Sequence, residues 1–211
     1  MGARWVCLDV GECLIDETRV WNEWARALGI PAFTLSAVFG GVIERGGHHA
    51  DTFALLGRPD WADLTPAVEA AYGGFQPGDM YPDALPALAR LRAAGYHVAV
   101  IANQPARRRD ELLALGVDVD VMAMSEAMGN KKPDPAFFEK ALELMGSPPP
   151  EDTLYVGDRI DYDMLPALAA RMRVIWLRRG PWGILQHLPA GTPPIPEAHT
   201  LLEVCDLVDA S

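Results

Sequence analysis

Acidic and amide side chains follow apolar runs at three widely separated places in this chain. Asp9, Asn103 and Asp158 each lie one or two residues past the end of such a run. An unpaired carboxylate beside a protein core is costly, so this repeated placement indicates a binding or catalytic site. Ligands of open α/β sheets bind beyond the carboxyl ends of the strands, and we therefore expect the three side chains to meet at one edge of a sheet.

The chain concentrates negative charge at and just after Asp158. Asp158, Asp161 and Asp163 lie within six residues of one another. If the fold brings them close to Asp9, these carboxylates repel one another unless a lysine or a metal cation lies among them. Mg²⁺ is a hard divalent cation that prefers oxygen ligands and suits a site that also holds phosphate. The pattern therefore predicts a Mg²⁺ site.

Four segments carry a family resemblance when their order and spacing are considered together. They are Leu8–Leu14, Val100–Gln104, Lys131–Pro135 and Val156–Asp163. In this arrangement the chain resembles, over nearly its whole length, the haloacid dehalogenase (HAD) superfamily, whose members attack their substrates with an aspartate carboxylate. Each segment alone is a weak signal, whereas the ordered combination of four is a strong one.

The resemblance implies a role for each acidic residue of the site. Asp9 would be the nucleophile and, through its second oxygen, a metal ligand. Asp158 would supply the second carboxylate ligand, and the backbone carbonyl of Gly11 would be a third ligand. Asp163, with Asp161 as a further candidate, would hold metal-bound water or pair with a lysine.

Lys132 and Asn103 complete the implied catalytic and substrate-binding set. Lys132 directly precedes Pro133, as in the family pattern, whereas Lys131 is expected to face solvent. Lys132 would neutralise the crowded carboxylates and bind the phosphoryl oxygens, as positioned cations do in phosphoryl transfer. Asn103 would donate a hydrogen bond to the transferred group.

The sequence departs from the phosphatase pattern of this family at two positions. Gly11 stands where phosphatases carry a second aspartate that protonates the leaving group, and Ala102 replaces the usual Ser or Thr. Glu12 carries a neighbouring carboxylate, but adjacent side chains usually point in different directions. His48 and His49 are a second candidate proton source, although beside a glycine pair they are more typical of an exposed loop.

Alternation of apolar runs with helical patterns predicts an α/β fold, a Rossmann-like parallel sheet with helices on both faces. The expected strands are Arg4–Leu8, His97–Ala102, Val119–Met122, Thr153–Val156 and Arg173–Trp176. Among the helices, one should be capped by Asp83, with Leu85, Leu88 and Leu91 in one buried stripe.

The alternation stops between about Glu17 and Pro77, where only helical patterns occur. We therefore expect two parts: an α/β core made of residues 1–14 and 79–211, and a small all-helical cap made of residues 15–78. The resemblance implies that the cap is inserted between the first two motifs and sets specificity. Arg45 and His48 are its candidate substrate-binding residues, with Phe39 and His49 as further candidates.

Composition limits the partners. The net charge of −11 argues against nucleic acid as a partner, because phosphate-backbone binding needs clustered Lys and Arg. The sequence holds no run of roughly 18 apolar residues, so we expect no membrane span. We expect no signal peptide, and the three cysteines form no CxxC pair, which together indicate a cytoplasmic protein with reduced thiols. The oligomeric state stays open.

Three functional hypotheses follow. The first is an enzyme, a Mg²⁺-dependent HAD-like hydrolase that cleaves a small phosphorylated molecule, a phosphomonoester or an acyl phosphate, through an aspartyl-phosphate intermediate, and that is impaired because Gly11 is not an acid. The second is a related enzyme. Dehalogenases work without metal and have no use for the acidic cluster, whereas phosphonate-cleaving relatives need a cap lysine, and Glu17–Pro77 contains none. The third is a non-catalytic module that binds metal or phosphate.

Overall fold

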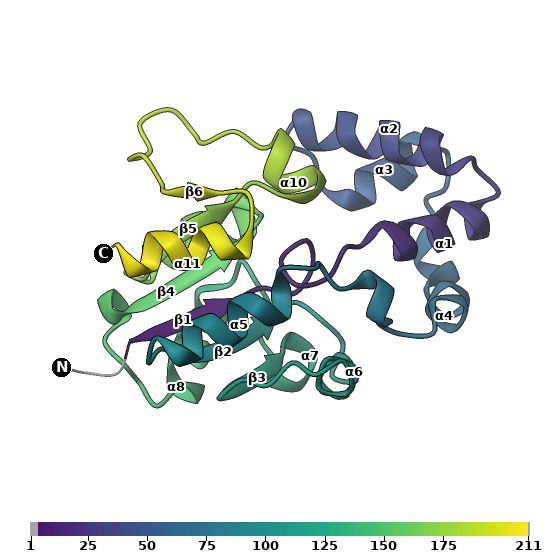
Figure 1. Cartoon of the computed structure of the whole chain (residues 1–211). Helices are drawn as coiled ribbons and strands as arrows, with labels where there is room; N and C mark the ends of the chain where they lie inside the picture. The colour runs from purple at the N-terminus through teal and green to yellow at the C-terminus, as the bar shows by residue number, and fades with distance from the viewer. Residues whose placement is uncertain (1–3, 211) are drawn as a thin grey trace.

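The computed structural model describes residues 4–210, which form one parallel sheet with helices around it (Figure 1). The sheet has six strands in the order β3-β2-β1-β4-β5-β6. The strands are β1 (Trp5–Leu8), β2 (His97–Ala102), β3 (Val121–Met124), β4 (Thr153–Gly157), β5 (Arg173–Leu177) and β6 (Glu197–Ala198). The predicted α/β class is therefore confirmed.

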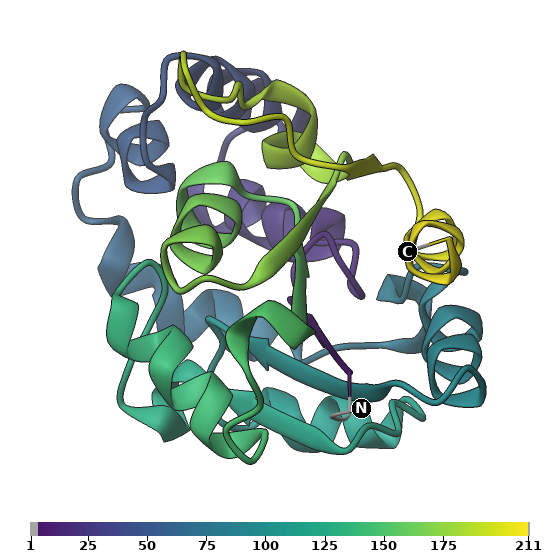
Figure 2. The ribbon, with the colours of Figure 1, turned by 90° about the vertical axis from the view of Figure 1, so that its left-hand side faces the viewer.

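Helices cover both faces of this sheet, which explains why the strands are apolar on both sides. The helices on the C-terminal side of residue 80 are α5 (Ala84–Ala93), α6 (Arg108–Ala114), α7 (Ser125–Met128), α8 (Pro135–Leu144), α9 (Leu165–Ala169), α10 (Gly180–Leu185) and α11 (Leu201–Asp209). Two short 3₁₀ helices, η1 (Pro77–Asp79) and η2 (Pro150–Asp152), and one short π-helix, η3 (Ile160–Met164), lie between other elements. Val6 and Leu8 pack in one cluster with α5 and α11, whereas Cys7 packs in a second with α8 and α9. Figure 2 shows these two helix pairs on opposite sides of the sheet.

Two strand predictions need correction. Strand β3 begins and ends two residues later than expected. The apolar run continues through Met124, and Met124 pairs with Ala102 at the end of β2. Strand β6 was not expected at all. It is only two residues long, follows a proline-rich stretch and pairs with β5 at Trp176 and Leu177, so nothing in its own sequence marks it as a strand.

The helix that begins after Asp83 also differs from its prediction. Leu88 and Leu91 are buried as expected, but Leu85 is 37% exposed and Ala84 and Ala87 are inside. Asp83 stands at the N-cap position, but its side chain accepts no capping hydrogen bond from the first turn of α5. Its carboxylate instead accepts hydrogen bonds from Arg179 at 2.9 Å and from the backbone N–H of Leu201 at 2.6 Å.

The segment between β1 and η1 contains helices and no strand, as predicted. Its helices are α1 (Thr18–Leu28), α2 (Ala32–Glu44), α3 (His49–Leu55) and α4 (Trp61–Tyr72). Figure 1 shows all four gathered beyond one end of the sheet. The boundaries of a cap at residues 15 and 78 stay a prediction.

The two chain segments that join these helices to the sheet run side by side. Ile15 and Met80 form an antiparallel bridge, and the N–H of Asp16 donates to the carbonyl of Asp79 at 2.7 Å. Arg19 reinforces the pair through a 2.6 Å ion pair with Asp79. The two chain connections between the helical segment and the sheet therefore form one double-stranded joint.

Between residues 4 and 210, no single helix is long and apolar enough to cross a bilayer, and α1 with α2 passes the same criteria only as a pair bent by 111°.

Candidate active site

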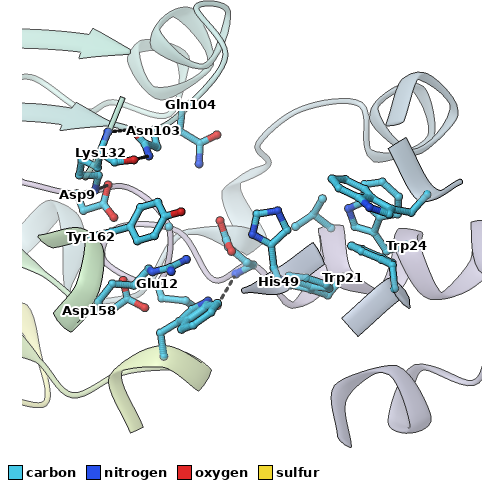
Figure 3. Close-up of a pocket in the computed structure, with 17 residues that line it drawn as sticks. Asp9, Glu12, Trp21, Trp24, His49, Asn103, Gln104, Lys132, Asp158 and Tyr162 are labelled. Atoms are coloured by element: carbon cyan, nitrogen blue, oxygen red, sulfur yellow. Dashed lines mark hydrogen bonds and ion pairs between the residues drawn. The ribbon is translucent and has the colours of Figure 1, made fainter. Parts of the chain in front are cut away.

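The strand order brings together the polar residues that follow β1, β2 and β4. Strand β1 lies between the other two, so Asp9, Asn103 and Asp158 emerge next to one another at the carboxyl edge. All three line one cavity of about 310 Å³. The predicted convergence of these side chains at one sheet edge is what the structure shows (Figure 3).

Three buried carboxylates cluster at this end of the sheet, and two of them, Asp9 and Asp158, line the cavity. One oxygen from each of Asp9, Asp158 and Asp163 lies within 4.8 Å of the others. The Lys132 ammonium lies 2.8 Å from Asp9 and 2.6 Å from Asp163. Burial alone would lower the pKa of Lys132, but the charges of Asp163 and Asp9 raise it, so the side chain is a cation.

Asp158 is the carboxylate of the three that forms no ion pair with Lys132. It is 2% exposed, and within the described chain no Lys, Arg or His nitrogen lies at ion-pair distance from its carboxylate. Burial, with the nearby charges of Asp163 and Asp9, raises its pKa well above the usual value. When ionised, the three carboxylates carry two more negative charges than the single Lys132 ammonium compensates, and clustered carboxylate oxygens of this kind fit Mg²⁺. The Gly11 carbonyl as a further ligand stays a prediction.

Asn103 holds the loop that carries Lys132. Its side-chain N–H donates to the Lys132 carbonyl at 2.9 Å, and its side-chain oxygen accepts from the Lys132 N–H at 2.8 Å. Asn103 also lines the cavity. The structure therefore gives Asn103 a positioning contact that the sequence did not predict, beside its predicted role toward the substrate.

Asp163 and Asp161 lie in different surroundings. Besides its contact with Lys132, Asp163 accepts the N–H of Arg159 at 2.9 Å. A Cβ atom at Gly157 would lie 2.4 Å from an Asp163 oxygen, so only glycine allows this close approach. Asp161 is exposed, pairs with Arg159 at 2.7 Å and does not line the cavity. Of the two candidates, Asp163 is the one in the carboxylate cluster.

The space beside Gly11 is filled by Glu17, which is not one of the predicted site residues. A Cβ atom built at Gly11 would lie 2.5 Å from Oε1 of Glu17, which also lines the cavity with Asp9. Burial, followed by the charges of Glu12 and Asp9, raises the pKa of Glu17 to about 7. Glu17 is the first residue of the helical segment, and no local pattern marks it as part of the site.

Glu12 lines the same cavity, but both of its carboxylate oxygens already have partners. One accepts the N–H of Glu17 at 3.0 Å, and the other accepts the hydroxyl of Tyr81 at 2.5 Å. The side chain is 6% exposed and therefore held in place. Its contacts are those of a residue that positions the Glu17 backbone.

The helical side of the cavity is aromatic. Arg45 and His48 do not line it, and His48 is an exposed residue whose Nδ1 accepts the N–H of Ala50 at the start of α3. Figure 3 shows Trp21, Trp24 and His49 across the cavity from the carboxylates. Residues of the helical segment that do line it are Glu17, Val20, Trp21, Trp24, His49, Phe53 and Trp61.

Comparison with curated proteins finds relatives that are named as phosphatases. The chain is 34% identical over 151 residues to the glyceraldehyde 3-phosphate phosphatase of Methanopyrus kandleri, a match that covers 66% of this chain and 63% of that protein. It is 29% identical over 179 residues to a plasmid-borne phosphoglycolate phosphatase of Cupriavidus necator, covering 80% of this chain and 76% of that protein. The chain thus spans less than two thirds of the first of these relatives.

Comparison with solved structures supports the same fold. The HAD-hydrolase YfnB of Bacillus subtilis, solved with bound magnesium, has a TM-score of 0.72 at 17% identity and covers 99% of this chain and 100% of that one. A family model described as haloacid dehalogenase-like hydrolase matches residues 3–171. This chain therefore belongs to the haloacid dehalogenase-like hydrolases.

Proposed function

We propose that this protein is a Mg²⁺-dependent phosphohydrolase that acts on a small phosphorylated molecule, a phosphomonoester or an acyl phosphate, through an aspartyl-phosphate intermediate. The observation that carries the proposal is the buried group of Asp9, Asp158 and Asp163 with Lys132 between two of them. The phosphatase names of its curated relatives support the same substrate class.

Asp9, Lys132 and Asp158 have separate roles in this reaction. An oxygen of Asp9 attacks phosphorus, and the bond between phosphorus and the leaving oxygen breaks. Lys132 offers a fixed positive charge to the phosphoryl oxygens, and no reorganisation of solvent is needed at the moment of reaction. Asp9 and Asp158 would hold Mg²⁺, which when bound would neutralise charge on the transferred group. Water then releases phosphate and restores the Asp9 carboxylate.

A dehalogenase function fits this cavity less well. A haloacid carries its own carboxylate, which the Asp9, Asp158 and Asp163 group would repel. The single lysine among the cavity-lining residues, Lys132, is already paired with two of these carboxylates. A phosphoryl group that arrives with a divalent cation brings the compensating charge with it.

The test uses acetyl phosphate and p-nitrophenyl phosphate with and without Mg²⁺. We expect Mg²⁺-dependent release of phosphate and a covalent phosphoryl adduct, sensitive to hydroxylamine, that mass spectrometry finds on Asp9. Asp9→Asn should abolish both. Calorimetric titration should show Mg²⁺ binding that Asp158→Ala removes. A protein that binds Mg²⁺ and forms no adduct with either compound would instead be the non-catalytic module.

A further inference from the structure

We propose that Glu17 replaces the missing second aspartate and is the general acid and base of this site, an inference that rests on the proposed phosphohydrolase function. Its carboxyl reaches from the helical segment into the space that a side chain at Gly11 would occupy, 2.5 Å from the position of that Cβ atom. The acid has therefore changed its place in the sequence and kept its place in the cavity.

Two contacts fix the residue there. The backbone N–H of Glu17 donates to Glu12, and the carbonyl of Glu17 accepts the N–H of Trp21 at 3.1 Å, which starts α1. Because Glu12 is itself held by Tyr81, the backbone on which the Glu17 carboxyl is mounted is anchored to the residues just after the first strand. A glycine at position 11 is what leaves room for this carboxyl.

The reaction balances with Glu17 in this role. As Asp9 attacks phosphorus, the electron pair of the breaking bond stays on the leaving oxygen, which takes the proton of the Glu17 carboxylic acid and departs as an alcohol. The Glu17 carboxylate then takes a proton from water while the water oxygen attacks phosphorus. This step breaks the bond to Asp9 and releases phosphate.

The test separates leaving groups by their need for a proton. General acid catalysis contributes about 10²–10⁴-fold in rate, and a leaving group that is already a stable anion gains little from it. Rapid-quench measurement of adduct formation should show that Glu17→Gln slows ethyl phosphate by about 10²–10⁴-fold and acetyl phosphate by less than about tenfold. The adduct should also accumulate in this variant, because water is no longer activated.

A relocation variant supplies the matched control. Gly11→Asp alone would force the Glu17 side chain aside, whereas Gly11→Asp combined with Glu17→Ala offers the aspartate an empty space. The double variant should hydrolyse ethyl phosphate at least about tenfold faster than Glu17→Ala. Equal slowing of both substrates by Glu17→Gln would overturn the proposal. So would a selective loss with Glu12→Gln in place of Glu17→Gln. Absence of any adduct in the natural protein would instead refute the proposed function itself.

A separate observation, the aromatic lining, points to the substrate. We infer that the ester group of the substrate carries a flat, uncharged, apolar part, an inference that also rests on the proposed function. The ring centroids of Trp24 and Trp61 lie 5.7 Å apart in an edge-to-face arrangement, and those of Phe53 and Trp61 lie 4.8 Å apart in a stack. All three side chains line the cavity. Burial, together with His48 and Arg159, lowers the pKa of His49 to about 4, so this wall is uncharged at neutral pH apart from Glu17.

Small charged substrates would find no partner on this wall. Glu17–Pro77 has no lysine, and of its arginines none lines the cavity. The other cavity-lining cation, Arg159, is paired with Asp161 and stacked on Tyr162 and Trp182 at 3.8 and 3.7 Å. A carboxylate on the substrate would therefore lose water without gaining a free cation.

Benzyl and ethyl phosphate distinguish the possibilities, because their alcohols differ little in basicity and greatly in flat apolar area. We expect kcat/KM to be at least about tenfold higher for benzyl phosphate, from the burial of one ring at roughly 25 cal/mol/Å². Trp61→Ala should remove most of that preference, Trp61→Leu should remove less, and Phe33→Ala, at a site 87% exposed on α2, should leave it intact. Equal or higher kcat/KM for ethyl phosphate or 2-phosphoglycolate would refute the inference.

Discussion

Lys132 is the residue on which the charge balance of the site depends. Its ammonium contacts Asp9 and Asp163, and all three side chains are at most 12% exposed. The Asn103 side chain forms hydrogen bonds with both the N–H and the carbonyl of Lys132. A buried ion pair adds little stability compared with an apolar replacement of the whole pair, but removal of one partner leaves an uncompensated buried charge.

Lys132→Met should therefore lower the free energy of unfolding by about 3–5 kcal/mol in the absence of metal. Urea denaturation followed by circular dichroism measures this. Lys140→Met is the matched control, because Lys140 pairs with Glu143 on the surface, at 38% and 65% exposure, and such pairs contribute about 1 kcal/mol or less. Similar losses in the two variants would contradict the charge-balance argument.

Residue patterns could locate the polar residues at the sheet edge of this cavity, but not its aromatic wall or the proposed replacement acid. Asp9, Asn103 and Asp158 follow strands, so the parallel sheet brings them together, and Lys132 has a motif of its own. Glu17 reaches the cavity through space from another element, and only the atoms around Gly11 show that it fills an absent side chain's place. A sequence records neighbours along the chain and leaves such a substitution in space unmarked.

At the scale of elements, apolar runs predicted five strands because both faces are buried along β1, β2, β4 and β5, and β3 is half-buried. Local patterns failed where a residue distant in the sequence determines the contact. Asp83 has the right position to cap α5, yet its carboxylate does not bind the first turn of that helix. It binds the Arg179 guanidinium and the N–H of Leu201 instead. The carboxylate therefore ties together α5, the end of β5 and the start of α11.

Asp83→Ala should lower the free energy of unfolding by about 1–3 kcal/mol, because Arg179 and the Leu201 N–H lose a partner in a half-buried position. Thermal unfolding measures the loss. The double variant Asp83→Ala/Arg179→Ala should lose less than the sum of the two single variants, as residues in contact do. Strict additivity would show that Asp83 acts on α5 alone.

At the scale of the whole molecule, the double-stranded joint connects the helical segment to the sheet. Arg19 donates to the Asp79 carboxylate and to the carbonyls of Tyr72 and Gly74, so one side chain near the start of α1 holds the return path of the chain. Lid closure over an active site excludes water and completes the catalytic set.

Arg19→Ala should loosen this joint while the sheet stays intact. We expect the free energy of unfolding to fall by about 1–3 kcal/mol, since Asp79 is 6% exposed and loses its cation. Hydrogen exchange should accelerate at residues 14–19 and 72–81 by at least about tenfold and remain unchanged in β1, β2 and β4. Uniform acceleration across the sheet would show that Arg19 supports global folding.

The position of Glu17 just beyond this joint has a consequence for the ancestry and engineering of the chain. An acid on the loop after the first strand is inherited with the sheet, whereas this carboxyl is inherited with the helices. Consider a chimera that receives its helical segment from a relative with aspartate after the first strand. Its sheet would carry Gly11 and its helices would carry no equivalent of Glu17, so neither part would supply the proton. Here the helices cannot be exchanged for new specificity without also exchanging chemistry.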